Sequence, residues 1–524
     1  MKLRTIVKIA ITSSVVLLCS GFALYSFFRL SAAEGQKDFN LYELVPSTTS
    51  AVFVTDDVLE FVAEVDELTC SKNQQYLYVS KLFSYLKQSL YALSEDTPHG
   101  LSRQMNQMLI SFHEPDNERN QVLYCRLGNG DKELVNRFVR KYISSLYPPK
   151  TFIYKGEEII IYPMADGDFL ACYLTSDFMA LSFQKKLIEN VIDAYKSGKS
   201  LADDSTFTGI RAPKKSAAAA TIYTRMQGMM GWTEFDMKMK DDFIYFSGIT
   251  HDADTCFAFI NQLRQQQSVK GFPGEVLPST AFYFSRQGIT DWMSLLSYGN
   301  AQGQSVPART SEVQNRDKEF SRYLMENAGQ DLVACLFQRE DTLQGAAAVL
   351  SLSVADVTEA ERMLRALVNA ASADEGRRNP RITFCYTVNK AYLIYRLPQT
   401  TLFEQLTSFV EPTLDVYAAF YGGRLLLAPD ADALTHYIRQ LDKGEVLNGA
   451  MAYQTGMDHL SDSYHFMLMA DFDHIFQQSE NHVRFVPDFF LRNADFFRHF
   501  TLFVQFACAD GVVYPNIVLK YKSE

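Results

Sequence analysis

Apolar residues recur along the chain in two patterns, and each pattern predicts a different element. Short apolar runs rich in Val, Ile, Phe and Tyr lie between turn residues, which is typical of strands. Examples are residues 50–55, 108–113 and 121–127. Longer stretches repeat apolar residues at helical spacing, as expected of helices that pack by one face. Because strands often follow one another directly, we predict an α+β fold with a mainly antiparallel sheet.

A turn that precedes one of these strands is repeated in the second half of the chain. The segment VPST at residues 45–48 precedes the strand-like SAVFVT, and LPST at residues 277–280 precedes AFYFS. The shift between them is 232 positions (277 − 45). The same shift aligns two Phe-x-Tyr segments, which begin at Phe152 and Phe384. This repetition predicts one architectural unit that occurs twice in the chain.

A second alignment strengthens this interpretation. Residues 178–201 align without gaps with residues 424–447. In both segments a short apolar strand turns into an amphipathic helix, and the helix is followed by Gly198 or Gly444. Glycine at this place readily adopts the left-handed conformation that closes a helix. The matches occur in the same order, so the sequence predicts two tandem copies of a sheet-and-helix domain.

The predicted domain boundaries follow from these matches. The first copy is predicted over residues 41–268 and the second over 277–524. Between them, residues 265–275 (QQQSVKGFPGE) are polar and contain two glycines and a proline, and we expect a linker at 269–276. Residues 299–315 are predicted to be a loop that occurs in the second copy alone.

Each copy is expected to contain the same series of elements. A first strand is followed by a helical stretch (residues 76–93 in the first copy) and a pair of strands. A helix then begins near Asp131 or Asp356, both acceptable N-caps. After it we predict a meander of three or four short strands, the glycine-ended helix and a last strand pair.

The N-terminal region contains a candidate membrane span. Residues 9–28 form twenty consecutive uncharged positions, preceded by Lys2, Arg4 and Lys8. A helix of that length, at about 1.5 Å per residue, crosses the roughly 30 Å hydrocarbon core of a bilayer. The preceding basic residues predict a cytoplasmic N-terminus (1–8), an anchor (9–28) and a linker (29–40), with the bulk outside the cytoplasm. The alternative is a signal peptide cleaved after residues 31–33 (SAA).

Composition narrows the class of protein. Hydrophobic residues make up 47% of the chain and aromatic residues 13%, which is enough for large packed cores. The net charge of −11 argues against a nucleic-acid partner. No Asn begins an N-x-Ser/Thr acceptor, which favours a bacterial envelope. We thus expect a single-pass protein of the bacterial inner membrane, with its bulk periplasmic and an envelope protein as partner.

Cysteines show no pattern typical of chemistry. Apart from Cys19 in the predicted span there are seven, most of them within apolar, strand-like runs, and no C-x-x-C is present. They are interpreted as small buried hydrophobic residues and not as redox or metal-binding groups.

The sequence offers two weak candidates for catalytic or metal-binding residues. Ser182 and Lys185 fit the S-x-x-K of serine acyltransferases, but the companion motifs are missing, and the second copy has Ala428 at the place of Ser182. The alternative is that Ser182 caps the following helix.

For a metal the best cluster is Asp471, Asp473 and His474, and its alternative is a polar turn at a strand end. No phosphate-binding glycine motif is complete, so no cofactor is expected.

The anchor, the Pro-Ser-Thr turn and the strand–helix–glycine unit that continues through residues 194–207 (AYKSGKSLADDSTF) suggest a relationship. Together they resemble uncharacterised bacterial envelope proteins of a domain-of-unknown-function family, found in Bacteroidetes-type genomes. The resemblance implies a periplasm-facing protein of duplicated α+β build, and it implies no activity or site residues.

From the sequence we expect a non-enzymatic binding or scaffolding role in the cell envelope. Two alternatives remain at this point. One is an envelope hydrolase whose site residues are dispersed along the chain. The other is a carrier of a lipid or hydrophobic ligand, in which the many aromatic residues line a cavity between sheet and helices.

Overall fold

The computed structural model describes residues 39–522 with internal gaps. The gaps are residues 74–104, 115–118, 129–130, 139–146, 165–166, 212–217, 226–230, 251–257, 297–310, 340–345, 375–381, 389, 398, 408–412, 478–485 and 487. The predicted anchor and the predicted helical stretch 76–93 lie outside the described residues. None of the helices in the described part of the chain combines the length and the hydropathy that a bilayer span requires.

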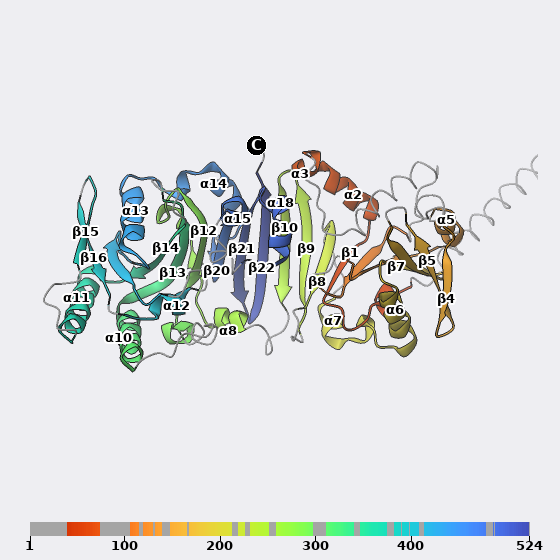
Figure 1. Ribbon diagram of the computed structural model, residues 1–524, viewed down its shortest axis with the longest axis horizontal. Helices are drawn as coiled ribbons and strands as arrows, with labels where there is room; N and C mark the ends of the chain where they lie inside the picture. The colour runs from red at the N-terminus through yellow and green to blue at the C-terminus, as the bar shows by residue number, and fades with distance from the viewer. Residues whose placement is uncertain are drawn as a thin grey trace, which may run out of the picture.

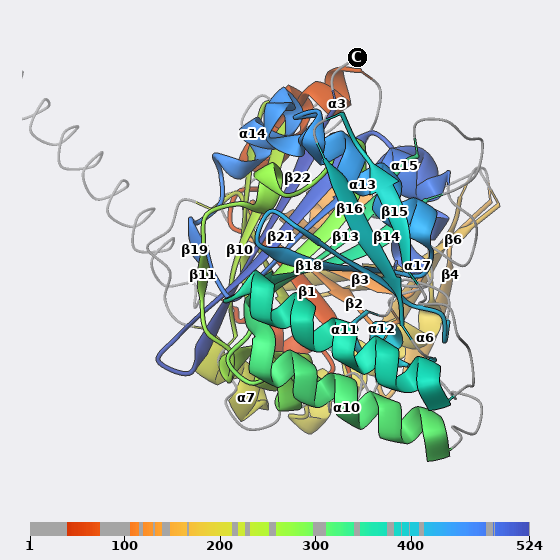
Figure 2. The same ribbon diagram turned by 90° about the vertical axis from the view of Figure 1, so that its left-hand side faces the viewer.

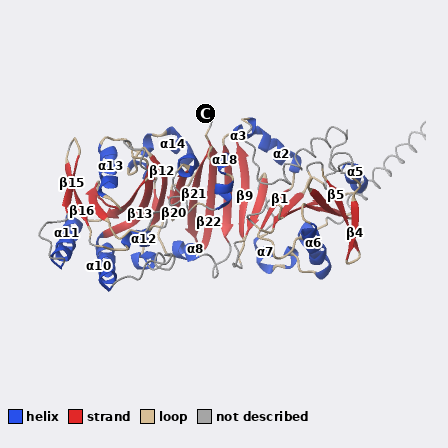
Figure 3. Ribbon diagram, in the orientation of Figure 1, coloured by secondary structure: helices blue, strands red, loops and turns tan. Residues whose placement is uncertain are grey.

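One continuous sheet of twenty strands organises the fold, and every described pairing in it is antiparallel (Figures 1 and 3). The predicted α+β class with a mainly antiparallel sheet is therefore confirmed. The first ten strands are β1 (Ala51–Thr55), β2 (Met108–Phe112), β3 (Gln121–Arg126), β4 (Lys150–Tyr154), β5 (Glu157–Pro163), β6 (Phe169–Leu174), β7 (Phe178–Ser182), β8 (Ala220–Thr224), β9 (Thr233–Lys240) and β10 (Phe243–Thr250). The other ten are β12 (Ala281–Gly288), β13 (Ala328–Phe337), β14 (Ala347–Val354), β15 (Ile382–Tyr386), β16 (Ala391–Arg396), β17 (Tyr417–Tyr421), β18 (Arg424–Ala428), β20 (Phe466–Asp471), β21 (Phe500–Ala509) and β22 (Val512–Tyr521).

Strand order is the same in the two halves of the sheet. The pairings run β4-β5-β6-β7-β3-β2-β1-β8-β9-β10 in the first half. In the second half they run β15-β16-β17-β18-β14-β13-β12-β20-β21-β22. The halves join edge to edge where β10 pairs with β22, and we call this junction the seam. Among the described strands, β4 and β15 are the two free edges of the sheet, and they lie at opposite ends of the molecule (Figure 1).

Helices cover both faces of the sheet. They are α2 (Val58–Glu67), α3 (Thr69–Lys72), α5 (Asp131–Phe138), α6 (Lys185–Ser197), α7 (Ser205–Ile210), α8 (Ala258–Arg264), α10 (Ser311–Asn327), α11 (Val357–Asp374), α12 (Leu402–Leu406), α13 (Ala431–Asp442), α14 (Met451–Met457), α15 (Phe472–Phe476), α17 (Asp488–Arg492) and α18 (Ala494–Phe497). Short 3-10 turns are η1 (Leu41–Leu44), η3 (Leu201–Asp203), η4 (Pro273–Glu275) and η5 (Leu447–Gly449). Figure 2 shows α10 and α11 side by side, and the Tyr323 hydroxyl of α10 donates to the Ala360 carbonyl of α11 at 3.1 Å.

The two glycine-ended helices form as predicted, each against its own half of the sheet. Apolar residues of α6 pack into one buried cluster, and those of α13 pack into another. Gly198 and Gly444 take left-handed φ values of 62° and 77°, which lets the chain turn away from each helix end. On the opposite face a single large cluster contains Phe61 and Ile244 from the first half together with Phe472 from the second. The ranges predicted as two domains thus share a hydrophobic core.

Several expected details differ from the structure. Each half ends in three strands (β8–β10 and β20–β22), not in a strand pair. The predicted linker 269–276 is not a free connection, because it contains η4 and the strand β11 (Val269–Lys270), which pairs with β19 (Ser463–Tyr464). The predicted loop 299–315 is wrong at its end, where α10 already begins at Ser311; its residues up to 310 lie outside the described part.

The alignment of Phe152 with Phe384 also differs from the structure. Phe152 lies opposite Ile159, which belongs to the core beneath α6. Phe384 lies opposite Leu393, which packs against the core on the face opposite α13. Since a slip of one residue turns a strand side chain to the other face, the shift of 232 positions does not hold through these edge strands.

Candidate functional site

The predicted serine–lysine pair is not assembled for catalysis. Ser182 is fully buried at the end of β7, where its Oγ donates to the Gln121 carbonyl at 2.7 Å and accepts from the Gln184 backbone N–H at 3.1 Å. Lys185 turns toward Glu189, with Nζ 2.8 Å from the carboxylate. A substrate has no path to a hydroxyl bonded in this way. The alternative, that Ser182 caps α6, is also inexact, because Gln184 is the N-cap residue and Ser182 stabilises the turn before it.

The predicted metal cluster is a helix cap. Asp471 is the N-cap of α15 and accepts backbone hydrogen bonds from Asp473 at 3.1 Å and His474 at 3.5 Å. Lys522 forms an ion pair with the same carboxylate. Burial raises the pKa of Asp471, but its hydrogen bond with His474 and the charge of Lys522 outweigh that effect and hold the pKa below its usual value. Among the described residues no cluster of three or more potential ligands could hold a metal ion.

The cysteines with described positions support the interpretation as buried hydrophobic residues. Five of them are buried as free thiols and Cys508 is half-buried. Burial raises the pKa of the Cys125 and Cys172 thiols to about 12, which keeps both protonated and unreactive.

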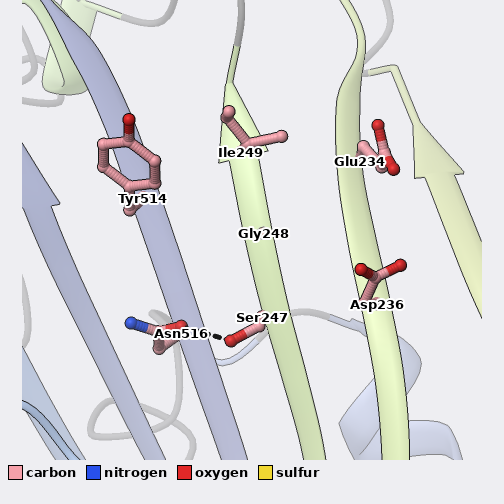
Figure 4. A pocket seen from close by; sticks show the side chains of 7 residues that line it. All are labelled: Glu234, Asp236, Ser247, Gly248, Ile249, Tyr514 and Asn516. Carbon is pink, nitrogen blue, oxygen red and sulfur yellow. Dashed lines mark hydrogen bonds between the residues drawn. The ribbon is translucent and has the colours of Figure 1, made fainter. Parts of the chain in front are cut away.

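The structure brings together a different set of polar residues, in an open groove over the seam. Its lining is formed by Glu234 and Asp236 of β9, by Ser247, Gly248 and Ile249 of β10, and by Tyr514 and Asn516 of β22 (Figure 4). We call this the central groove; its volume is about 320 Å³. Glu234 lies opposite Tyr223, a member of the core beneath α6, so the groove opens on the face that carries α6.

Strand register aligns a belt of polar side chains across the groove. Asp236, Ser247 and Asn516 are direct partners on β9, β10 and β22. The Ser247 Oγ donates to the Asn516 Oδ1 at 2.8 Å, which links the two halves at the seam (Figure 4). The belt continues on one side to Thr221, whose Oγ1 is 3.3 Å from Asp236 Oδ1, and on the other to Gln505. A row of hydrogen-bonding groups therefore crosses five strands.

A second row combines charge with apolar surface. Glu234 and Ile249 are direct partners on β9 and β10, and Tyr514 of β22 lines the same part of the groove. Glu234 is only 8% exposed, whereas Tyr514 is 37% exposed. Burial raises the pKa of the neighbouring Tyr223 well above its usual value, and the charges of Tyr42 and Glu234 raise it further. This end of the groove is thus acidic and carries an accessible aromatic ring.

The floor of the groove depends on a glycine. A Cβ at Gly248 would lie 2.7 Å from ring atoms of Phe235 and 2.7 Å from the ring of Pro515, both on neighbouring strands. These contacts are closer than van der Waals packing permits, so no larger residue fits without a shift of the strands.

The lining consists of acidic, hydrogen-bonding and apolar groups. None of its seven residues is a cysteine, histidine or lysine. Two carboxylates, a hydroxyl–amide pair and a tyrosine can accept and donate hydrogen bonds and attract a positive charge. They offer no activated nucleophile with a neighbouring base, which acyl transfer requires.

The sequence did not predict the central groove, because the residues that line it form no local motif. The one usable signal was the alternation in β9 (TEFDMKMK), which places the charged residues Glu234, Asp236, Lys238 and Lys240 on one face of a strand. Nothing in the sequence pairs that strand, through β10, with β22 at the C-terminus.

Comparisons of the chain with protein-family models, with curated proteins and with solved structures found no match.

Proposed function

We propose that this protein is a non-enzymatic binding or scaffolding module, tethered to the bacterial inner membrane, that receives its ligand or partner in the central groove. The observation that carries the proposal is the polar belt over the seam, where Asp236, Ser247 and Asn516 line an open groove. A groove of this kind, with convergent polar groups and one aromatic ring, is typical of binding sites.

The lining suggests the chemistry of the occupant. Asp236 and Glu234 attract an amine or guanidinium group, and at an effective dielectric near a protein surface one such pair at close range is worth up to about 4 kcal/mol before desolvation. Ser247, Asn516 and Tyr514 supply hydrogen bonds and a ring on which an apolar part can rest. A basic segment of an envelope protein fits this combination.

The tether is argued from the sequence. Residues 9–28 are uncharged and follow three basic residues, so the proposed orientation places residues 1–8 in the cytoplasm and the twenty-stranded sheet in the periplasm. An anchored protein meets its partner at the membrane surface, where a modest affinity at the groove is raised by the shared location.

We further infer that the two halves arose by duplication. Three features support this inference. The strand order is the same in each half, a glycine-ended helix packs at the same place, and the Pro-Ser-Thr turn makes an equivalent bridge. That bridge joins Pro46 to Ser200 in the first half and Pro278 to Val446 in the second.

A site-specific crosslink tests the role of the groove. A photoreactive amino acid is placed at Tyr514 of the full-length protein in native membranes, and a second version carries it at Phe169, which is 58% exposed but far from the seam. We expect a discrete crosslinked partner from position 514 alone, with its yield at least five-fold lower when Asp236→Asn is added.

The control substitution is Lys240→Ala, an exposed position on the same strand outside the groove. It should leave the crosslink unchanged. A crosslink of equal yield from positions 514 and 169, or one insensitive to Asp236→Asn, would contradict the proposal. Turnover of an envelope substrate that persists in the Asp236→Asn protein would contradict the non-enzymatic role.

A further inference from the structure

The edge strand β4 carries exposed apolar and basic side chains close to the point where the described chain begins. We propose that this edge rests on the membrane surface, at the level of the lipid headgroups, and fixes the orientation of the sheet. The inference rests on the proposed tether and adds a second, independent contact with the bilayer. The surface consists of Tyr147, Lys150, Phe152, Ile153 and Lys155, and we call it the β4 surface.

The first described residue is held near this end of the sheet. The ring of Phe39 lies 4.8 Å from that of Phe178 on β7 and 6.0 Å from that of Tyr195 on α6. Its carbonyl accepts a hydrogen bond from Arg126 Nε at 2.6 Å. Strand β7 is three positions from the free edge β4, a separation of about 15 Å at the usual strand spacing.

The remaining tether is short. Only residues 29–38 lie between the uncharged run 9–28 and Phe39. Ten residues span at most about 35 Å when fully extended. An inserted anchor therefore holds the β4 end of the sheet close to the bilayer, while β15 lies at the other end of the molecule (Figure 1).

The β4 surface has an apolar component that a solvated edge does not need. Tyr147 is 73% exposed, Ile153 is 71% exposed and Phe152 is 43% exposed. Free sheet edges are commonly protected by charges or by a covering segment. Aromatic and branched side chains at such an edge gain free energy when they leave water for the headgroup–acyl boundary.

Charge on the same end fits an anionic lipid surface. The β4–β5 hairpin and α6 with its following turn (residues 150–163 and 185–199) contain six lysines and four acidic residues, a net charge of +2 (6 − 4), although the whole chain carries −11. Lysine side chains lay their carbon stems along apolar surface while the ammonium group reaches the headgroups. Lys185 of α6 lies next to the β4 surface, with its Nζ 5.0 Å above the ring of Phe152 and 2.8 Å from the Glu189 carboxylate.

The depth of the contact follows from the backbone. An edge strand has unpaired N–H and C=O groups, and these are costly in hydrocarbon, where no water can bond them. At the headgroup level water and lipid oxygens satisfy them, so β4 should lie at the interface and not deeper.

The opposite edge supplies a matched control. On β15, Phe384 is 53% exposed and Tyr386 is 65% exposed, so it is as apolar as β4 but far from the anchor. If exposed apolar edges bind lipid without help from the tether or the lysines, both β4 and β15 should contribute to vesicle binding. If β4 instead pairs with a strand of a second copy, its substitution should change the oligomeric state.

The test uses the full-length protein, reconstituted into vesicles of equal parts phosphatidylglycerol and phosphatidylcholine, with a protease site introduced within residues 31–37. After cleavage, flotation measures how much of the released chain stays with the vesicles. We expect retention that falls at least about five-fold in Phe152→Asp/Ile153→Asp and in vesicles of phosphatidylcholine alone. The Phe384→Asp/Tyr386→Asp control should be retained like the parent.

Three results would overturn the inference. One is complete release of the cleaved parent chain from the anionic vesicles. Another is equal retention of both double variants, and the third is a dimer of the parent chain that the β4 substitutions abolish. Circular dichroism of each variant shows whether it is folded. Alkaline extraction of the uncleaved protein tests the anchor separately, so a failed tether is distinguished from a failed β4 contact.

Discussion

The backbone N–H of Leu201 donates a hydrogen bond to the carbonyl of Val45 at 2.8 Å. The second half repeats this bond, from Leu447 to the carbonyl of Leu277 at 2.9 Å. All four side chains are buried in the core beneath the glycine-ended helix of their own half. In each half the segment after the helix is therefore fixed to the turn that starts the first strand, and the glycine between helix and segment makes this return possible.

We expect Gly198→Ala and Gly444→Ala to destabilise the protein by similar amounts. Both residues have positive φ, and no atom lies within 4 Å of a Cβ added at either place, so the cost is backbone strain without a clash. That strain is about 1 kcal/mol or slightly more for an L-residue. Urea unfolding of the detergent-solubilised protein measures it. Gly209→Ala, in α7 with ordinary φ and open space, is the control and should be neutral or stabilising.

The buried carboxylate of Asp331 on β13 is expected to be the most sensitive charged group in the second half of the sheet. Arg286 Nε lies 3.0 Å from it, and Arg424 Nη1 lies 3.3 Å from it. Removal of the charge in Asp331→Asn leaves two largely buried guanidinium groups without their anion, at a cost of about 3 kcal/mol. Asp415→Asn breaks the exposed pair with Arg396 and should cost less than about 1 kcal/mol. Equal effects of the two substitutions in urea unfolding would contradict this.

The carboxylate of Asp331 should also make the free energy of unfolding depend on pH in the acidic range. Burial raises the pKa of Asp331, but Arg424 and Arg286 and a hydrogen bond with Ser353 outweigh it and hold the pKa below its ordinary value. The group is ionised in the folded state at a pH where the unfolded chain already binds a proton. Its contribution is complete above about pH 4 and is lost as the pH falls through the lower folded value. The free energy of unfolding of the Asp331→Asn protein, measured in urea, should not show this loss as the pH falls.

His113 should produce a second loss of stability at higher pH. Burial lowers its pKa to about 4, and its Nε2 lies 2.9 Å from Ser111 Oγ. The unfolded chain binds a proton near pH 6.5, so stability that is complete above that value is lost as the pH falls toward 4, by about 3 kcal/mol. His113→Gln keeps a hydrogen-bonding side chain. The free energy of unfolding of this variant should therefore change less with pH in this window. A slope unchanged by the substitution would disprove the assignment.

Much of the fold was predictable because local patterns encode it. The strands expected at residues 108–113 and 121–127 appear as β2 and β3, since short apolar runs bounded by turn residues favour buried strands. Asp356 accepts backbone N–H bonds from Thr358 at 2.9 Å and Glu359 at 3.1 Å, the capping role expected of it at the start of α11. Such features depend on a few neighbouring residues and form independently of the rest of the fold.

The candidate site was not predictable in the same way. Ser182 and Lys185 stood out because they match a short motif, yet in the fold the hydroxyl is buried and bonded to backbone while the ammonium pairs with Glu189. Spacing along a chain does not specify which way two side chains point once a strand becomes a helix between them. Conversely, Ser247 and Asn516 carry no motif but are bonded to each other across the seam.

By itself the sequence determined the elements: where strands run, where the two helices end at Gly198 and Gly444, and that this series occurs in both halves. These follow from side-chain periodicity and from the φ angles that glycine alone adopts easily. Only the tertiary structure decided that the halves share one sheet, which face Phe152 and Phe384 occupy, and that β9, β10 and β22 form a groove. The reason is physical, because pairing between distant strands is set by the packing of whole faces, and one residue of register exchanges one face for the other.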